Sequence, residues 1–162
     1  MNISKKILET LENDCRVSAK NFALMLDKEE GDIKKMIEDM EREKIIIGYK
    51  AMIDWEKTDK EYVTALIELR VSPQRDGGFD KIAEKIYTYD EVQSVYLMSG
   101  GYDIMVMLEG RTMREVAFFV AEKLAVMDNV VSTATHFVLR KYKEKGVIYS
   151  DDARADTREN TF

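Results

Sequence analysis

The chain has 162 residues, 45% of them hydrophobic and 35% charged, so it can bury the core of one ordinary domain or of two small ones. Its net charge of −6 excludes a molecule that as a whole attracts nucleic acid or an anionic membrane. The single cysteine, Cys15, excludes an internal disulfide and favours the reducing cytoplasm. No apolar run reaches the roughly 20 residues of a membrane helix, and the N-terminus lacks the apolar segment of a signal peptide.

The first part of the chain carries three predicted short helices between residues 4 and 44. Ser18 is the expected N-cap of the second helix, and Asp27 with Glu30 has capping-box character before the third. The third helix has the clearest helical period, carried by Ile33, Met36, Ile37 and Met40. Because the second and third helices are separated by only a few residues, they predict a helix-turn-helix.

An apolar, strand-like run follows the third helix at residues 45–53. It predicts that a plain or winged helix-turn-helix domain occupies residues 1–53. Residues 54–61 are polar and without period, which is typical of a linker. Residues 147–162 also lack a period and are predicted to be a disordered tail.

The second half of the chain predicts the order β-α-β-β-α-β over residues 62–146, the ferredoxin-like plan. The fold class is therefore α+β. Thr112 with Glu115 has the spacing of a capping box at the start of the second helix. Strands are predicted at 62–71, 92–98, 104–108 and 130–142, and a loop is marked by Pro73, Gly77 and Gly78. Several strands are apolar on both faces, so a second copy of the chain is expected to cover the face without helices.

Two glycines separate the two central strands and are followed at once by Tyr102 and Asp103. Gly100 and Gly101 allow positive φ and leave backbone N–H groups uncovered. These groups can hold the carboxylate of a zwitterionic ligand, while Asp103 holds its ammonium. The alternative interpretation is a hairpin turn that binds no ligand.

The ordered set of these elements resembles the Lrp/AsnC family, the feast/famine regulators. The resemblance extends to about residue 145 and is specific as a set, although each piece alone is weak. It is carried by Ile7–Leu11, Arg16–Ser18, Phe22–Ala23, Ile33–Ile46, Gly48–Asp54 and Gly100–Asp103.

The resemblance implies a transcriptional regulator whose C-terminal domain dimerises, often assembles into octamers, and senses a small amino acid. In that family the effector lies in clefts between neighbouring dimers, lined by the glycine-containing hairpin. Gly100, Gly101, Tyr102 and Asp103 are therefore the expected effector-binding residues. Thr133 and Thr135 share a face of the last strand and are further candidates, with a plain solvent-facing pair as the alternative.

The predicted recognition helix departs from the family, which usually carries hydroxyl residues and arginines there. Residues 27–44 contain eight acidic and five basic residues, a net charge of −3, and like charge opposes the phosphate contacts that supply most affinity for DNA. The remaining candidates for contact with double-stranded DNA are Lys34, Lys35, Arg16 and Lys20. The sequence therefore predicts DNA binding that is weak and strongly dependent on salt, or that is lost.

Two other functions stay open. One is an amino-acid-sensing oligomer that acts through a DNA-competent paralogue. The other is an enzyme, since siroheme decarboxylases resemble this architecture and are associated with histidines near the substrate. The single histidine, His136, is interpreted as a hydrogen-bonded strand residue. No catalytic residue, metal-ligand cluster or cofactor motif is found, so the prediction is a non-enzymatic regulator whose only small-molecule partner is an amino acid.

Overall fold

The computed structural model describes residues 3–72 and 78–149, and these residues form two compact units that meet between Ile53 and Asp54. The predicted loop at Pro73 and Gly77 lies outside the described residues. In the described part, no helix is long and apolar enough to cross a membrane.

The first unit contains three helices: α1 (Ile3–Asn13), α2 (Ala19–Leu26) and α3 (Glu30–Arg42). Each contributes apolar side chains at helical spacing to one small core, and the buried members are Ile7, Phe22, Ala23, Ile33 and Met40. The short connection between α2 and α3 makes them a helix-turn-helix. The three predicted helices are present.

The helix boundaries confirm one predicted cap and correct another. The Ser18 hydroxyl accepts a hydrogen bond from the N–H of Asn21 at 3.2 Å, as an N-cap should. Asp27, however, takes a left-handed φ of 52° and ends α2, so it cannot start α3. The N-cap of α3 is Glu29, which makes no side-chain cap hydrogen bond. The predicted capping box is wrong because one short turn must end α2 before α3 begins.

The segment after α3 does not form the predicted strand. Residues 47–54 are irregular, and Ile47 is 89% exposed. A strand requires a neighbour to satisfy its N–H and C=O groups, and no strand of the described first unit supplies one. The segment is held instead by the Tyr49 hydroxyl, which donates to Glu41 Oε1 at 2.8 Å.

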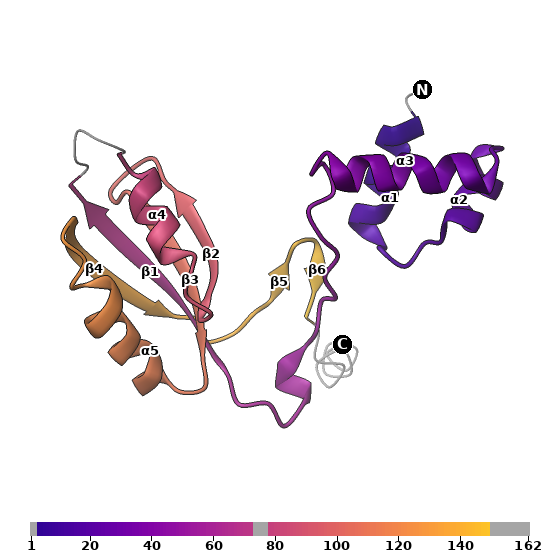
Figure 1. Cartoon of the computed structure of the whole chain (residues 1–162). Coiled ribbons are helices and arrows are strands. Elements are labelled where there is room, and N and C mark those ends of the chain that lie inside the picture. The colour runs from indigo at the N-terminus through magenta and orange to yellow at the C-terminus, as the bar shows by residue number, and fades with distance from the viewer. Residues whose placement is uncertain (1–2, 73–77, 150–162) are drawn as a thin grey trace, which may run out of the picture. The chain divides into compact units, whose positions relative to one another are not determined.

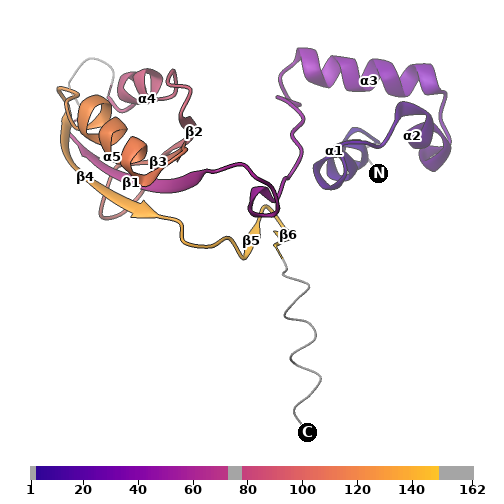
Figure 2. The same cartoon turned by 90° about the horizontal axis from the view of Figure 1, so that it is seen from below.

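The second unit confirms the predicted order β-α-β-β-α-β. It contains β1 (Val63–Val71), α4 (Asp80–Ile86), β2 (Val92–Leu97), β3 (Ile104–Gly110), α5 (Met113–Phe119) and β4 (Val130–Phe137). One turn of π-helix, Val120–Leu124, continues α5. The sheet is antiparallel with the strand order β2-β3-β1-β4, and both helices lie on one of its faces (Figures 1 and 2).

Strand alternation places the core between the sheet and the two helices. Ile67 and Val106, on β1 and β3, point toward the helices and are fully buried. Gly110 ends β3 where α5 approaches closely, because a Cβ there would lie 3.0 Å from Val116 Cγ2. The start of α5 is fixed by the predicted capping box, in which the N–H of Glu115 donates to Thr112 Oγ1 at 3.1 Å.

The other face of the sheet carries no helix and is the face predicted to be covered by a second copy. Leu66, Met105 and Met107 lie on it and are half-buried. Thr64 on the same face is 4% exposed, and its Oγ1 atom has no hydrogen-bond partner among the described residues. The three apolar side chains make this face the surface on which a second copy is expected, and its coverage stays a prediction.

The last predicted strand is too long. Pairing with β1 ends where Phe137 lies opposite Ala65, followed by one bond from the N–H of Val138 to the carbonyl of Thr64. Beyond Val138 the described chain forms no further pairing with β1. The chain forms a second hairpin of β5 (Lys143–Glu144) and β6 (Val147–Ile148), so the predicted tail begins with a strand. Residues 150–162 of that tail lie outside the described residues.

Candidate DNA interface and effector site

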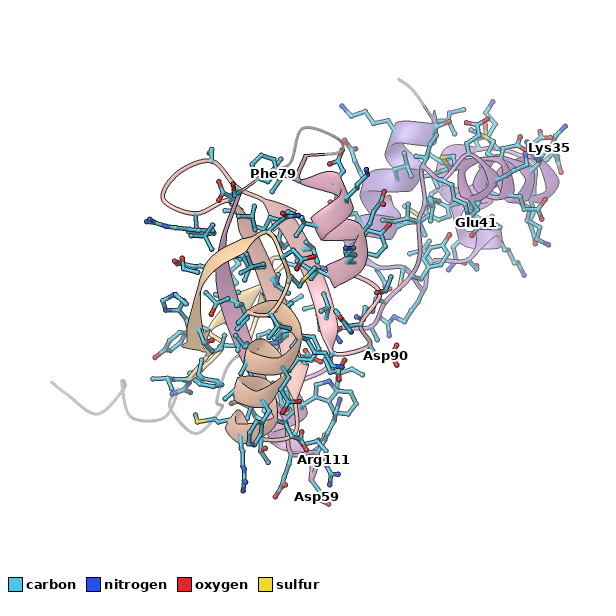
Figure 3. The ribbon with its side chains drawn as sticks, turned by 60° about the vertical axis from the view of Figure 1, so that its left-hand side comes forward. Lys35, Glu41, Asp59, Phe79, Asp90 and Arg111 are labelled. Carbon is cyan, nitrogen blue, oxygen red and sulfur yellow. The ribbon has the colours of Figure 1, made fainter. Side chains whose placement is uncertain are left out.

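The outer face of α3 is the part of the helix-turn-helix that is free to enter a DNA groove. Gly31, Lys35, Glu38 and Arg42 follow one another at helical spacing on the side opposite Ile33 and Met40, and all four are exposed. Lys35 extends from this side of α3 (Figure 3). The acidic residues lie mainly on the flanks, so the net charge of −3 counted along the segment is not the charge of the outermost face.

The four predicted DNA-contacting cations differ in how they are held. Lys34 is paired with Glu30 of its own helix at 2.7 Å, and Arg16 with Asp14 at 3.0 Å. A side-chain hydrogen bond to Asp14 raises the pKa of Arg16. Lys20 and Lys35 are exposed and form no ion pair within the ranges 3–72 and 78–149. Sequence reasoning missed Glu30 as the partner of Lys34, although their separation of four residues is a recognisable signal.

The glycine hairpin joins β2 and β3 at one end of the sheet. Gly100 has a φ of 130°, a conformation that favours glycine, and a Cβ at Gly100 or Gly101 would meet open space. Among the described residues, no hydrogen bond uses the N–H of Gly100, Gly101 or Tyr102. The Tyr102 hydroxyl lies 3.9 Å from the Met105 sulfur. The hairpin therefore presents unpaired backbone donors, as predicted.

Asp103 anchors this hairpin to β1. Its Oδ2 atom accepts a hydrogen bond from the N–H of Val71 at 2.8 Å, and its own N–H donates to the carbonyl of Leu69 at 2.9 Å. Its Oδ1 atom has no partner in the described part of the chain. The carboxylate thus has a structural role that sequence reasoning missed, because nothing in the sequence links position 103 to position 71. One oxygen remains available for a ligand.

The two threonines are not brought to the hairpin within one chain. Leu69 pairs with Ile104 of β3 on one side and with Thr133 of β4 on the other. Thr133 is therefore separated from the hairpin by the whole of β1, which is two strand spacings of about 4.8 Å each. Thr135 lies one pair further along β4, opposite Ile67, and shares the helix-side face with Thr133.

The two best-formed cavities of the described chain lie elsewhere. One has a volume of about 300 Å³ and lies beside α5, with Phe118, Phe119 and Val116 among its lining residues. The other, of about 420 Å³, lies between α1 and α3, with Leu8, Met36 and Met40 among its lining residues. The hairpin residues Gly100–Asp103 line neither of these two cavities.

His136 has a structural partner rather than a catalytic neighbourhood. Its Nε2 atom lies 3.3 Å from Glu68 Oε1, across β1 and β4 on the face without helices. In the described ranges, no group of three or more His, Cys, Asp and Glu side chains is placed to hold a metal ion.

Comparison with known proteins identifies the family. Residues 64–148 match the model of the Lrp/AsnC ligand binding domain. The uncharacterized HTH-type transcriptional regulator YugG of Bacillus subtilis is 48% identical over 153 residues, which cover 92% of each chain. The chain belongs to the Lrp/AsnC family. The regulatory protein AsnC of Haemophilus influenzae is 28% identical, over 83% of this chain and 87% of that protein.

Solved structures of this family show the same fold. The transcriptional regulator NMB0573 of Neisseria meningitidis, solved as a complex with L-Met, aligns with a TM-score of 0.72 at 19% identity. The alignment covers 89% of this chain and 92% of that one. The protein is thus a transcriptional regulator of the Lrp/AsnC type, with a helix-turn-helix and a ferredoxin-like ligand-binding domain. Its named relatives are regulators rather than enzymes.

Proposed function

We propose that this regulator acts as a homo-oligomer in which an amino acid, bound at Gly100–Asp103, controls how the helix-turn-helix units engage DNA. The observation that carries this proposal is the hairpin itself. It offers backbone N–H groups and one carboxylate oxygen that are unpaired among the described residues, and it lines neither of the two cavities described above. A neighbouring copy is the simplest means of closing such a site.

The chemistry of the hairpin selects for a zwitterion. The free N–H groups of the glycines suit a carboxylate, and Asp103 Oδ1 suits an ammonium group. The L-Met complex of the Neisseria regulator supports an amino-acid ligand for the fold. Thr133 and Thr135 contribute in this proposal only from another copy, because β1 separates them from the hairpin of their own chain.

The DNA interface in this proposal is the outer face of α3 with Lys35 at its centre. Lys20, Lys34 and Arg16 provide additional contacts to the DNA phosphates. Lys34 and Arg16 can do so only by leaving the carboxylates of Glu30 and Asp14. Binding is accordingly weak for one unit and rises when linked units bind together in a homo-oligomer. The amino acid shifts the population between assemblies, which requires different affinities for the two states.

The test is DNA binding by the purified protein to the region upstream of its own gene. Fluorescence anisotropy is recorded from low to physiological salt, with and without a pool of the twenty amino acids, and the same ligands are tested by calorimetry. Selective binding that an amino acid shifts is the expected result. Asp103→Asn should retain DNA binding and lose the response to the amino acid. A variant that responds like the wild type would remove Asp103 from the site.

The acidic flanks of α3 favour one other function, a sensor that reaches DNA only through a DNA-competent paralogue. The same titration separates the two. Amino-acid binding without selective DNA binding, even at low salt, would support the sensor and overturn direct regulation.

A further inference from the structure

Glu30 and Lys34 stand one helical turn apart at the start of α3. Lys34 Nζ lies 2.7 Å from Glu30 Oε1, and the two side chains remain 59% and 43% exposed respectively. The hydrogen bond between them raises the pKa of Lys34 and lowers the pKa of Glu30. The ammonium group of Lys34, which the sequence predicts to contact DNA, is therefore already paired with a carboxylate of the same helix.

Glu30 also interacts electrostatically with a second cation. The charge of Lys20, from the neighbouring helix α2, also lowers the pKa of Glu30. One carboxylate thus lies in the field of two of the four basic residues predicted to touch DNA. Lys35, one residue further along α3, has no ion pair in the described part of the chain.

A phosphate oxygen and a carboxylate oxygen compete for the same ammonium protons. Each phosphate that a protein neutralises adds about 0.9 to the slope of log K against log salt. A lysine that stays with Glu30 adds nothing to that slope, and its carboxylate repels the approaching phosphates. Phosphate contacts carry no sequence information, so the loss is the same for every DNA sequence.

We propose that Glu30 sets the overall DNA affinity of this regulator by withholding Lys34 from the phosphate backbone, without altering sequence preference. The inference rests on the proposed direct contact of α3 with DNA. It assigns to Glu30 the role of a positioning residue that acts through Lys34.

The experiment is a double-mutant cycle of Glu30→Gln, Lys34→Ala and the double variant in the full-length protein. Two DNA duplexes are used, the upstream region and a scrambled sequence of equal length, and anisotropy is measured across a range of salt. We expect Glu30→Gln to raise affinity about three- to tenfold on both duplexes and to steepen the salt slope by about 0.9. In the Lys34→Ala background, the same change should have little effect.

Asp32→Asn is the matched control, because Asp32 is also an exposed carboxylate in the first turn of α3 but forms no ion pair within residues 3–72 and 78–149. It removes one negative charge and should leave the slope unchanged. Urea unfolding of each variant checks that the fold is retained, since Glu30 also complements the helix dipole.

Three results would overturn the inference. The first is a gain in affinity from Glu30→Gln that persists without Lys34. The second is a gain in the DNA affinity of Glu30→Gln that is no larger than that of Asp32→Asn and leaves the salt slope unchanged. The third is wild-type binding to the upstream duplex with no change in Glu30→Gln. Absence of binding by every protein, even at low salt, would instead remove direct DNA contact, and the proposed function with it.

Discussion

At the scale of single residues, Asp103 holds the hairpin with one carboxylate oxygen and leaves the other available for a ligand. Its Oδ2 atom accepts the N–H of Val71, a residue that is 7% exposed. Removing the acceptor leaves that N–H group unsatisfied near the end of β1. We therefore expect the Asp103→Ala substitution to destabilise the second unit.

We predict that Asp103→Ala lowers the free energy of unfolding by about 1–3 kcal/mol, because a buried donor loses its charged partner. Asp103→Asn keeps an acceptor oxygen and should lose less than half as much. Urea unfolding followed by circular dichroism measures both. If Asp103→Ala were as stable as the wild type, the hydrogen bond to Val71 would not contribute to stability. The ligand response of Asp103→Asn could then be interpreted without a change in stability.

A second residue-scale effect concerns Tyr49, which ties the segment after α3 back to that helix. Partial burial, followed by the hydrogen bond to Glu41, raises the pKa of Tyr49 to about 12 from its ordinary value of 10.0. A raised pKa means that the folded protein holds the phenol proton more tightly than the unfolded chain does. The stabilisation is therefore complete below pH 10 and is lost as the pH rises toward 12.

We predict that the stability difference between the wild type and Tyr49→Phe is constant from pH 7 to about 9.5 and shrinks at higher pH. The measurement is urea unfolding at a series of pH values. Tyr87→Phe is the control, because Tyr87 is 60% exposed and makes no hydrogen bond through its hydroxyl in the described part of the chain. A difference that grew with pH would contradict the assignment of the raised pKa to Tyr49.

At the scale of elements, two glycines show how neighbours decide the effect of the same substitution. Gly31 occupies the first turn of α3, and a Cβ there would meet no atom within 4 Å. Gly110 ends β3 beneath α5, and a Cβ there would lie 3.0 Å from Val116, which is 2% exposed and cannot move aside freely.

We predict that Gly31→Ala stabilises the first unit by about 0.5–1 kcal/mol, because alanine loses less backbone entropy than glycine in a helix. Thermal unfolding of the full chain should show the gain. The same variant should bind DNA less tightly if α3 brings its backbone close to the groove at this point. A stabilised protein with unchanged DNA affinity would place the closest approach elsewhere on α3.

For Gly110→Ala the expected sign is the opposite, a loss of about 1–3 kcal/mol from overpacking against Val116. Gly101→Ala serves as the control, because Gly101 lies in the turn between β2 and β3 and its Cβ would meet open space. Chemical unfolding of the two variants side by side makes the comparison. Equal stability of the two variants would show that the contact between β3 and α5 can accommodate a methyl group at position 110.

At the scale of the whole molecule, the face of the sheet without helices is the surface through which we expect copies of the chain to assemble. Leu66, Met105 and Met107 form its apolar centre, and the unsatisfied hydroxyl of Thr64 lies on the same face. A second copy that covers this face would remove apolar surface from water at roughly 25 cal/mol per Å². The effector hairpin lies at an end of the same sheet, which is how assembly and ligand binding become coupled in the proposal.

We predict that Met107→Lys converts the oligomer to smaller species while leaving each chain folded, because a lysine ammonium cannot be buried without a partner. Light scattering after size-exclusion chromatography measures the mass, and circular dichroism checks the fold. Gln93→Lys is the control, since Gln93 is exposed on β2 at the edge of the sheet. An unchanged mass for Met107→Lys would show that this face is not the interface.

The elements that depend on local pattern were predictable from the sequence. Helical spacing of apolar residues located α1 to α3, and β-branched runs separated by glycines located β2 and β3. The order of the second unit and two of the three caps, at Ser18 and Thr112, followed from short-range rules that act within a few residues. The hairpin between β2 and β3 was also located at this level from its two glycines, while its role as the effector site stays a prediction.

What required the tertiary structure were the relations between distant parts of the chain. The bond from Val71 to Asp103, the separation of Thr133 from the hairpin by β1 and the end of β4 at Phe137 all depend on strand register. Residues 45–53 have the composition of a strand but lack a partner in the described chain, so composition alone predicted the wrong structure there. The net charge of α3 likewise does not describe its outer face, because the helix exposes Lys35 there and pairs Lys34 with Glu30. Pairing and burial are decided by atoms far apart in the sequence, and only the folded chain brings those atoms together.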